Sequence, residues 1–195
     1  MHGMINRAIQ GFVTDTYGPE RWARMACAAG LGFTDFEAML VYDVALTPRI
    51  LNAVCGDLEK PGDEVLEDIG TYLVSHPNAE AVRRLLRFGG VDFVEFLHSL
   101  DDLPDRARLA VPNLDLPELE LHERAPDRFS LTLRWSLDGF GHVMMGALRT
   151  LADDYGALVL LDHQDTEDGR EMIDITLIET GFAEGRDFDL GARAG

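Results

Sequence analysis

Residues 91–117 read VDFVEFLHSLDDLPDRARLAVPNLDLP and join two halves of the chain that carry different apolar patterns. Within residues 91–100 the apolar side chains recur at helical spacing. Pro104 then interrupts the pattern, because a proline ring inside a helix removes one backbone hydrogen bond and clashes with the preceding turn. The stretch therefore predicts either a helix that ends near Leu103 or a second helix that begins at Pro104.

The residues before this stretch read as a series of amphipathic helices. Proline, glycine or a capping residue separates consecutive apolar patterns, as expected at helix ends. Thr47 and Asn78 are predicted to cap two of these helices. Arg83, Arg84 and Arg87 are predicted to be exposed on the last one. The predicted helices cover residues 4–17, 19–29, 48–58, 62–76 and 79–88.

The residues after this stretch change to the alternation that is typical of strands with one buried face. A polar turn at 164–170 separates the last two apolar segments, which predicts a hairpin. Strands are predicted at 118–122, 131–137, 157–161 and 172–178, and a helix at 140–155.

A helical first half followed by antiparallel strands with packed helices predicts an α+β fold. The length of 195 residues suits one domain. We expect this domain to cover residues 1–185, with a helical subdomain at 1–90 and an α/β subdomain at 91–185. Residues 186–195 are predicted to form a loose tail.

The charge of the chain restricts its partners. Lys and Arg number 17 against 35 Asp and Glu, so the formal net charge is −18. Nucleic acids and anionic membrane surfaces need a cationic footprint, and the sequence offers none, so neither is an expected partner. Such acidity is expected to serve solubility.

The compartment is predicted from what the sequence lacks. The N-terminus has no long apolar signal-peptide core, and no apolar run approaches the ~20 residues of a membrane span. Cys27 and Cys55 lie among apolar residues without metal-binding spacing, which predicts buried thiols in a reducing compartment. A cytoplasmic protein is therefore expected.

Local catalytic or metal-binding motifs are weak. No serine or cysteine stands in a recognisable nucleophile context, and there is neither a glycine-rich phosphate loop nor an HExxH motif. The chain is therefore predicted not to be an enzyme, and no metal site is predicted. The six histidines are scattered without an i,i+4 pair, at positions 2, 76, 98, 122, 142 and 163.

Several stretches resemble the haem-nitric-oxide/oxygen-binding (H-NOX) domain family. The resemblance spans nearly the whole chain, in order. It implies a haem pocket between a helical and an α/β subdomain, an iron-binding histidine, and a tyrosine-x-serine-x-arginine motif that grips the haem propionates. It also implies that nitric oxide binding is read by a partner kinase or cyclase. The stretches are MHGMINRAIQGFVTDTYG, FEAMLVYDVALT, LEDIGTYLVSH, FVEFLHSLDDLPDRARLAVPNLDLPEL and VMMGALRTLADDYG.

Carried over residue by residue, the resemblance places Pro104 where the family has its iron-binding histidine. Pro112 and Pro117 follow at the family's spacing of eight and thirteen residues. A proline side chain cannot ligate iron, so the family's usual ligation is predicted to be lost. The positions of the propionate motif are occupied by Leu133, Trp135 and Leu137.

The change at the propionate motif agrees with the loss of the histidine. Leu133, Trp135 and Leu137 offer only apolar surface and one indole N–H. Two propionates buried against them would remain unpaired, at a cost on the order of several kcal/mol each. Together with Leu131 these side chains are predicted to form one apolar strand face that fills part of the ancestral cavity.

Other pocket positions keep an apolar character. Ile5, Leu73 and Val143 correspond to the family's distal positions, and Pro117 to the proline that presses on the porphyrin; the alternative is that all four are core residues. His98 is the nearest substitute ligand in sequence. His98 lies six residues before Pro104, about 240° past a full helical turn. Its side chain would therefore point to a different helix face from Pro104, unless the break at Pro104 rotates the helix.

Three functions are compared. The first is an H-NOX signalling domain whose haem is lost or replaced by an apolar small ligand or a diatomic gas. The chain ends at Gly195 without an effector segment, so its effector is expected to be a separate histidine kinase or diguanylate cyclase. The second is a haem-based nitric oxide sensor with an unconventional axial ligand. The third is an unrelated small enzyme, which would need a polar cluster in a cleft.

Overall fold

The computed structural model describes residues 1–112, 114–166 and 169–186. Helices fill the first half and an antiparallel sheet with a packed helix fills the second, which confirms the predicted α+β class. A short 3-10 helix, η1, spans Pro77–Ala79. The helices are α1 (Gly3–Tyr17), α2 (Pro19–Ala28), α3 (Leu46–Leu58), α4 (Gly62–Ser75), α5 (Glu80–Arg87), α6 (Phe93–His98), α7 (Leu103–Ala110) and α8 (Phe140–Tyr155). The strands are β1 (Glu118–Ala125), β2 (Arg128–Arg134), β3 (Leu158–Asp165) and β4 (Glu171–Glu179).

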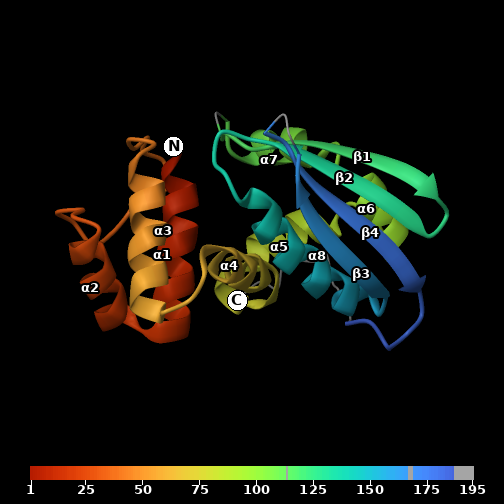
Figure 1. Ribbon diagram of the computed structural model, residues 1–195, viewed down its shortest axis with the longest axis horizontal. Helices are drawn as coiled ribbons and strands as arrows, with labels where there is room; N and C mark the ends of the chain where they lie inside the picture. The colour runs from red at the N-terminus through yellow and green to blue at the C-terminus, as the bar shows by residue number, and fades with distance from the viewer. Residues whose placement is uncertain (113, 167–168, 187–195) are drawn as a thin grey trace.

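The sheet has the order β1-β2-β4-β3 with every neighbouring pair antiparallel. The predicted hairpin between the last two apolar segments is confirmed as β3 and β4. The register places Leu131 opposite Ile173 and Phe129 opposite Ile175, so their side chains share one face. These side chains pack with α8 into one apolar cluster, and Figure 1 shows α8 lying along the sheet.

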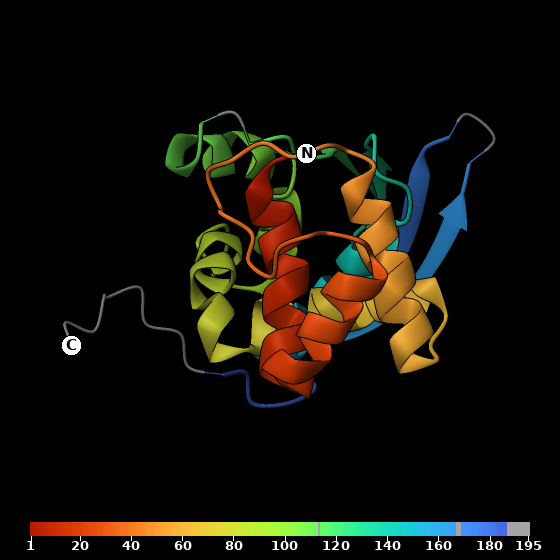
Figure 2. The ribbon, with the colours of Figure 1, turned by 90° about the vertical axis from the view of Figure 1, so that its left-hand side faces the viewer.

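A second apolar cluster holds the first four helices together. Phe12, Trp22, Ile50 and Ile69 contribute one buried side chain each from α1, α2, α3 and α4. The connection over residues 29–45 passes over the start of α1, as Figure 2 shows. Backbone hydrogen bonds from Gly3 N to Leu40 O (2.7 Å) and from Tyr42 N to Met1 O (2.9 Å) hold it there.

Helices α4 and α8 join the two halves by an unusually close crossing. A Cβ atom at Gly70 of α4 would lie 2.0 Å from the Val143 carbonyl oxygen of α8. A Cβ atom at Gly146 of α8 would lie 2.0 Å from the Glu67 carbonyl oxygen of α4. Because atoms cannot approach so closely, only glycine at both positions allows this contact between the two backbones.

Two predicted helix caps are wrong. Helix α3 begins at Leu46, and Thr47 lies inside it, where its buried hydroxyl donates a hydrogen bond to Asn6 Oδ1 at 2.7 Å. Asn78 lies within η1, and the His76 side chain accepts from the backbone N–H of Asn78. Thr47 therefore bonds to a side chain of α1, and the backbone of Asn78 bonds to the His76 side chain, so neither residue caps a helix.

The arginines of α5 are half-buried, so the prediction that they are exposed is wrong. Arg83 Nε lies 2.7 Å from Oδ2 of Asp154, a buried carboxylate on α8. The Arg87 guanidinium lies over the ring of Tyr155, 3.8 Å from its centroid. Both side chains thus reach from α5 to residues of α8.

A new helix, α7, begins at Leu103, just before Pro104. The pattern at 91–100 gives the short helix α6, which ends at His98, and Pro104 occupies the first turn of α7, where a missing N–H costs nothing. The second of the two predicted alternatives is therefore confirmed. The predicted strand at 131–137 is shifted by three residues toward the N-terminus, because β2 spans Arg128–Arg134.

The thiols also differ from the prediction. Cys27 is exposed and Cys55 is half-buried, and both are free. Burial raises the pKa of the Cys55 thiol. Cys27 lies on the outer side of α2, a position that its apolar neighbours in the sequence did not reveal.

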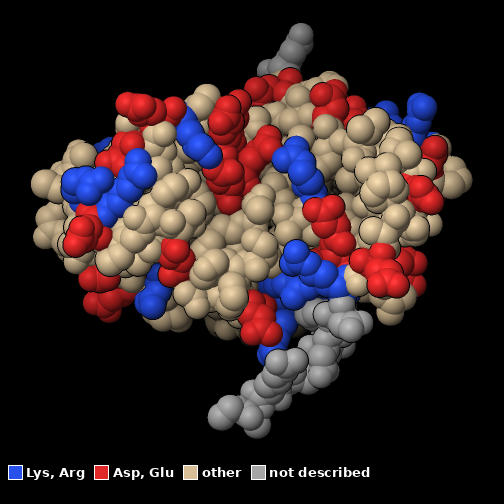
Figure 3. All heavy atoms as spheres, turned by 90° about the horizontal axis from the view of Figure 1, so that it is seen from below, with Lys and Arg blue, Asp and Glu red and all other residues tan. Residues whose placement is uncertain are grey.

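The surface carries charges of both signs. On the face shown in Figure 3, basic side chains lie among acidic ones and form no continuous stripe. None of the described helices combines the length and apolar character that crossing a bilayer requires. The predicted tail at 186–195 lies outside the described residues apart from Arg186, whose backbone N–H donates to Asp154 O at 2.9 Å. The predicted subdomain boundary at residue 90 stays a prediction.

Candidate functional site

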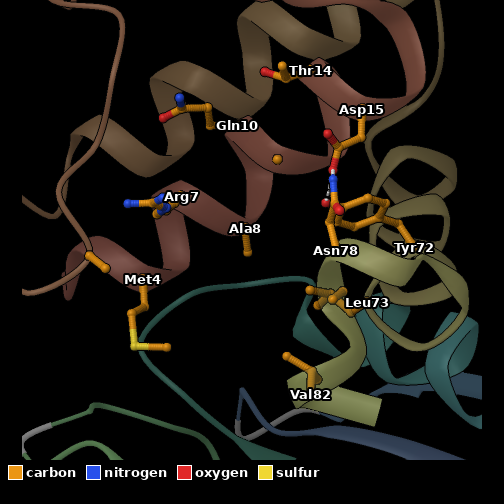
Figure 4. A pocket seen from close by; sticks show the side chains of 13 residues that line it. Met4, Arg7, Ala8, Gln10, Thr14, Asp15, Tyr72, Leu73, Asn78 and Val82 are labelled. Carbon is orange, nitrogen blue, oxygen red and sulfur yellow. Dashed lines mark hydrogen bonds between the residues drawn. The ribbon is translucent and has the colours of Figure 1, made fainter. Parts of the chain in front are cut away.

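A cavity of about 590 Å³ lies between α1, α4 and α5. Figure 4 shows Leu73 of α4 and Val82 of α5 pointing toward the side on which Met4 and Ala8 of α1 lie. These four side chains give the cavity an apolar end. The cavity is lined by Met4, Arg7, Ala8, Gln10, Gly11, Thr14, Asp15, Ala38, Tyr72, Leu73, Asn78, Ala79 and Val82.

One stripe of α1 supplies much of this lining. Met4, Ala8, Gly11 and Asp15 recur three or four residues apart, so they share one face of the helix. Ala8 and Gly11 have little or no side chain, and this leaves space between α1 and the helices opposite. The opposite face of α1 carries buried residues of the helical core, such as Ile9 and Val13.

The other end of the cavity is polar and built around Asp15. Tyr72 donates its hydroxyl hydrogen to Asp15 Oδ2 at 2.6 Å, and the Asn78 side-chain amide donates to the same oxygen at 3.0 Å. Figure 4 shows these three side chains meeting at one point. His76 Nδ1 lies 3.6 Å from that oxygen, and its ring stacks on Tyr72. A short network thus ties α1 to α4 and to η1.

These contacts shift the pKa values of Asp15 and Tyr72. The hydrogen bond from Tyr72 lowers the pKa of Asp15 below its ordinary value, although partial burial acts in the opposite direction. Burial, followed by the hydrogen bond to Asp15, raises the pKa of Tyr72 far above its ordinary value. The network is therefore held by an ionised carboxylate and a neutral phenol near neutral pH.

Of the four predicted pocket residues, Leu73 alone is among the described residues that line the cavity. Ile5 is half-buried on α1, one residue beyond Met4. Val143 is buried on α8, where its carbonyl faces Gly70. Pro117 is buried just before β1. The structure therefore does not bring these four residues together around this cavity.

Pro104 and His98 occupy different surroundings. Pro104 is buried in the first turn of α7. His98 ends α6, and its side chain is 48% exposed, with Nε2 3.2 Å from a carboxylate oxygen of Glu123. Its ring also meets the edge of Phe129. His98 is therefore not among the residues that line the cavity.

The residues at the predicted propionate-motif positions do not form one strand face. Leu133 is buried in β2, whereas Trp135 and Leu137 are half-buried beyond the end of that strand. Trp135 packs edge-on against Phe140, with ring centroids 5.0 Å apart. Leu133 and Trp135 line a second, smaller cavity of about 260 Å³ at the end of the sheet.

Residues 2–163 match the model of the Haem-NO-binding family, HNOB. The chain belongs to the HNOB (H-NOX) family. Members of this family are haem-binding sensor domains for nitric oxide and oxygen, and they act with effectors such as kinases or cyclases. The matched region is the sensor domain.

Curated relatives of this H-NOX chain are much longer proteins. Soluble guanylate cyclase gcy-31 of Caenorhabditis elegans is 25% identical over 155 residues, which is 79% of this chain and 22% of the cyclase. Soluble guanylate cyclase 89Db of Drosophila melanogaster is 21% identical over 158 residues, or 81% of this chain and 24% of the cyclase. The chain thus spans less than a quarter of the length of these relatives.

Solved H-NOX structures share the fold at low sequence identity. A mutant of the H-NOX protein of S. oneidensis in the Fe(II) state has a TM-score of 0.78 at 18% identity, covering 96% of this chain and all of that one. The Fe(II) unliganded H-NOX protein from K. algicida has a TM-score of 0.76 at 17% identity, covering 97% of this chain and 100% of that one. The predicted H-NOX-like fold is confirmed.

The described residues that line the larger cavity supply few donors for a haem iron. Iron needs a donor such as an imidazole, a thiolate or a phenolate. No histidine or cysteine is among the described residues that line the larger cavity, and the Tyr72 hydroxyl is engaged with Asp15. Pro104 offers no donor at the position the resemblance assigns to the ligand.

Sequence reasoning missed the polar end of the cavity. The sequence patterns predicted a capping role for Asn78 and singled out neither Asp15 nor Tyr72. The two hydrogen bonds join residues that are separated by 57 and by 63 positions in the sequence, so no local motif predicts them. A tyrosine among the inward positions of a helix was the one available signal, since a buried hydroxyl needs a partner.

Proposed function

We propose that this chain is an H-NOX sensor domain that has lost the family's usual haem ligation and signals to a separate effector protein in the cytoplasm. In this proposal it is not an enzyme, and the effector is a histidine kinase or a diguanylate cyclase. The observation that carries the proposal is Pro104, which lies buried in the first turn of α7. The resemblance to the family assigns the axial histidine to this position.

The lining of the larger cavity supports a ligand of another class. Met4, Ala8, Leu73 and Val82 provide an apolar end, and the Asp15 network provides hydrogen-bonding groups at the other end. Binding pockets for small molecules commonly combine an apolar wall with a few oriented polar groups. We propose that the cavity takes an apolar small molecule in place of haem.

The close crossing of α4 and α8 suggests how binding would be transmitted. Leu73 and Tyr72 of α4 line the cavity, and Gly70, less than one turn earlier, touches the backbone of α8. A ligand that displaces α4 must therefore also displace α8 or break that contact. Because α8 packs on the sheet, an effector bound to the sheet side would sense the cavity.

The absorbance spectrum of the protein, expressed with an ample haem supply, tests the loss of haem ligation. We expect the purified wild-type chain to lack a Soret band. A Soret band at one haem per chain that survives gel filtration would contradict the proposal and favour the alternative of a haem-based nitric oxide sensor with an unconventional ligand.

An apolar fluorescent probe, N-phenyl-1-naphthylamine, tests the cavity itself. We expect saturable binding by the wild type and at least about tenfold weaker binding by Ala8→Trp, whose indole would occupy the apolar end. Ala81→Trp is the matched control, because Ala81 is exposed on α5 and does not line the cavity. Equal binding by the two variants would exclude this cavity as the site.

A further inference from the structure

A histidine and two carboxylates lie together on the face of the sheet that α8 covers. The register pairs Glu171 of β4 with both Leu133 of β2 and Asp165 of β3, so these residues form one row across the sheet. His163 lies two residues before Asp165 and therefore points to the same face. One donor atom each from His163, Asp165 and Glu171 lies within 4.8 Å of the others.

The two inner donors of this cluster are well shielded and already oriented. The side chains of His163 and Glu171 are 11% and 14% exposed, and His163 Nε2 lies 2.9 Å from Glu171 Oε2. The backbone N–H of Gly141, at the start of α8, donates to the same carboxylate oxygen at 2.8 Å. A Cβ atom at Gly141 would lie 2.4 Å from His163 Nε2, so the glycine leaves room for this arrangement.

The cluster opens onto the smaller cavity of about 260 Å³. Asp165 and Glu171 line that cavity together with Asp138, a third carboxylate, and with Arg170, which supplies one positive charge. Trp135 also lines it, and its buried indole N–H has no hydrogen-bond acceptor among the described residues. The site thus has space beside the three candidate metal ligands, and the Trp135 N–H in its wall is a hydrogen-bond donor without an acceptor among the described residues.

We propose that His163, Asp165 and Glu171 bind a divalent transition-metal ion, with zinc as the favoured ion. One imidazole nitrogen and two carboxylate oxygens are ligands of zinc, and bonds of about 2.0–2.2 Å would hold the donors about 3–4 Å apart. In the proposed site the exposed Asp165 side chain would rotate to reach that spacing. Three protein ligands leave at least one coordination position for water or a small anion on the cavity side.

Neighbouring groups support the three ligands. The Gly141 N–H holds Glu171, as ligating carboxylates in metal sites are usually held by a hydrogen bond. The ring of His142 packs against that of His163 with centroids 4.3 Å apart. His142 Nδ1 lies 3.9 Å from a Glu67 oxygen on α4. A metal ion would therefore join the hairpin, the start of α8 and, through His142, helix α4.

Calorimetric titration of the metal-free full chain with zinc tests this proposal. We expect one zinc ion per chain, and at least about tenfold weaker binding by Asp165→Asn and by His163→Ala. Asp165 is exposed, so Asp165→Asn is expected to fold normally even if His163→Ala does not. His122→Ala is the matched control, because it removes an exposed imidazole that pairs with Glu120 on β1 of the same sheet.

Zinc binding by the wild type that weakens in both site variants and not in His122→Ala supports the site. Absence of zinc binding, or equal binding by wild type and Asp165→Asn, overturns it. The site shares no described lining residue with the larger cavity, so this result is independent of the haem spectrum and of the apolar probe.

Discussion

The two sides of helix α4 are packed in opposite ways. Toward α8, Gly70 and Gly146 bring two backbones into direct contact, and Arg149 adds an ion pair with Glu67 at 2.8 Å. Toward α1, the small residues Ala8 and Gly11 leave a cavity of about 590 Å³. One helix therefore has a fixed side and an open side.

This difference in packing indicates where the fold can respond to a ligand. Close-packed interfaces have few alternative arrangements, because even a single added methylene is felt. A cavity lacks such constraints, and its hydrogen-bond network around Asp15 can adjust. We infer that α4 moves with α8 as one unit, so that a ligand in the cavity displaces both helices relative to α1.

The largest expected effect is on the fixed side. Gly70→Ala places a methyl group against the α8 backbone and is expected to lower the free energy of unfolding by about 3 kcal/mol or more. Gly56→Ala on α3 is the control, because a Cβ atom at this exposed glycine would meet nothing within 4 Å. That variant is expected to be stabilised by about 0.5–1 kcal/mol. Urea unfolding measures both, and similar midpoints would refute the close crossing.

The end of β2 and the residue just beyond it give the next effect. Leu133→Ala empties a fully buried position and is expected to cost about 3 kcal/mol. Trp135→Ala removes a larger side chain that is only half-buried beyond the strand, so we expect a smaller loss of about 1–2 kcal/mol. If urea midpoints show Trp135→Ala to be the more damaging variant, Trp135 is a core residue and its placement here is wrong.

The smallest expected effect is on the open side. Tyr72→Phe removes one hydrogen bond to Asp15 and is expected to cost about 1 kcal/mol at neutral pH. Because this bond lowers the pKa of Asp15, its stabilisation is present above the ordinary value of 3.8 and is lost as the pH falls through the lower folded value. Unfolding of both proteins between pH 7 and pH 3 checks this, and a difference that grows toward acid would contradict it.

Much of the fold could be predicted from local patterns. The helix at 140–155 and the hairpin of β3 and β4 follow from apolar periodicity and turn residues, and the structure confirms both. Thr47 shows where such reasoning stops. Its position before Pro48 indicates a cap, but the partner that decides its role is Asn6, which lies 41 residues away. Tertiary contacts override a local preference whenever a buried hydroxyl needs an acceptor.

The candidate sites were less accessible to sequence reasoning. The substitution at Pro104 could be read because the family pattern supplies the expected residue. The Asp15 network and the His163 cluster could not, since their members lie on different elements and meet only through packing. His163 and Glu171 become neighbours through the register of the β3–β4 hairpin. That register could not be predicted from the position of a histidine near the end of a strand.

Haem titration of the wild type beside Pro104→His tests most directly whether this chain has lost both the axial donor and the propionate-binding groups. We expect the wild type to give no stable haem spectrum and Pro104→His to bind haem weakly at most, because Leu133 and Trp135 offer the propionates no positive charge. A stable five-coordinate haem spectrum from either protein after gel filtration would contradict this account.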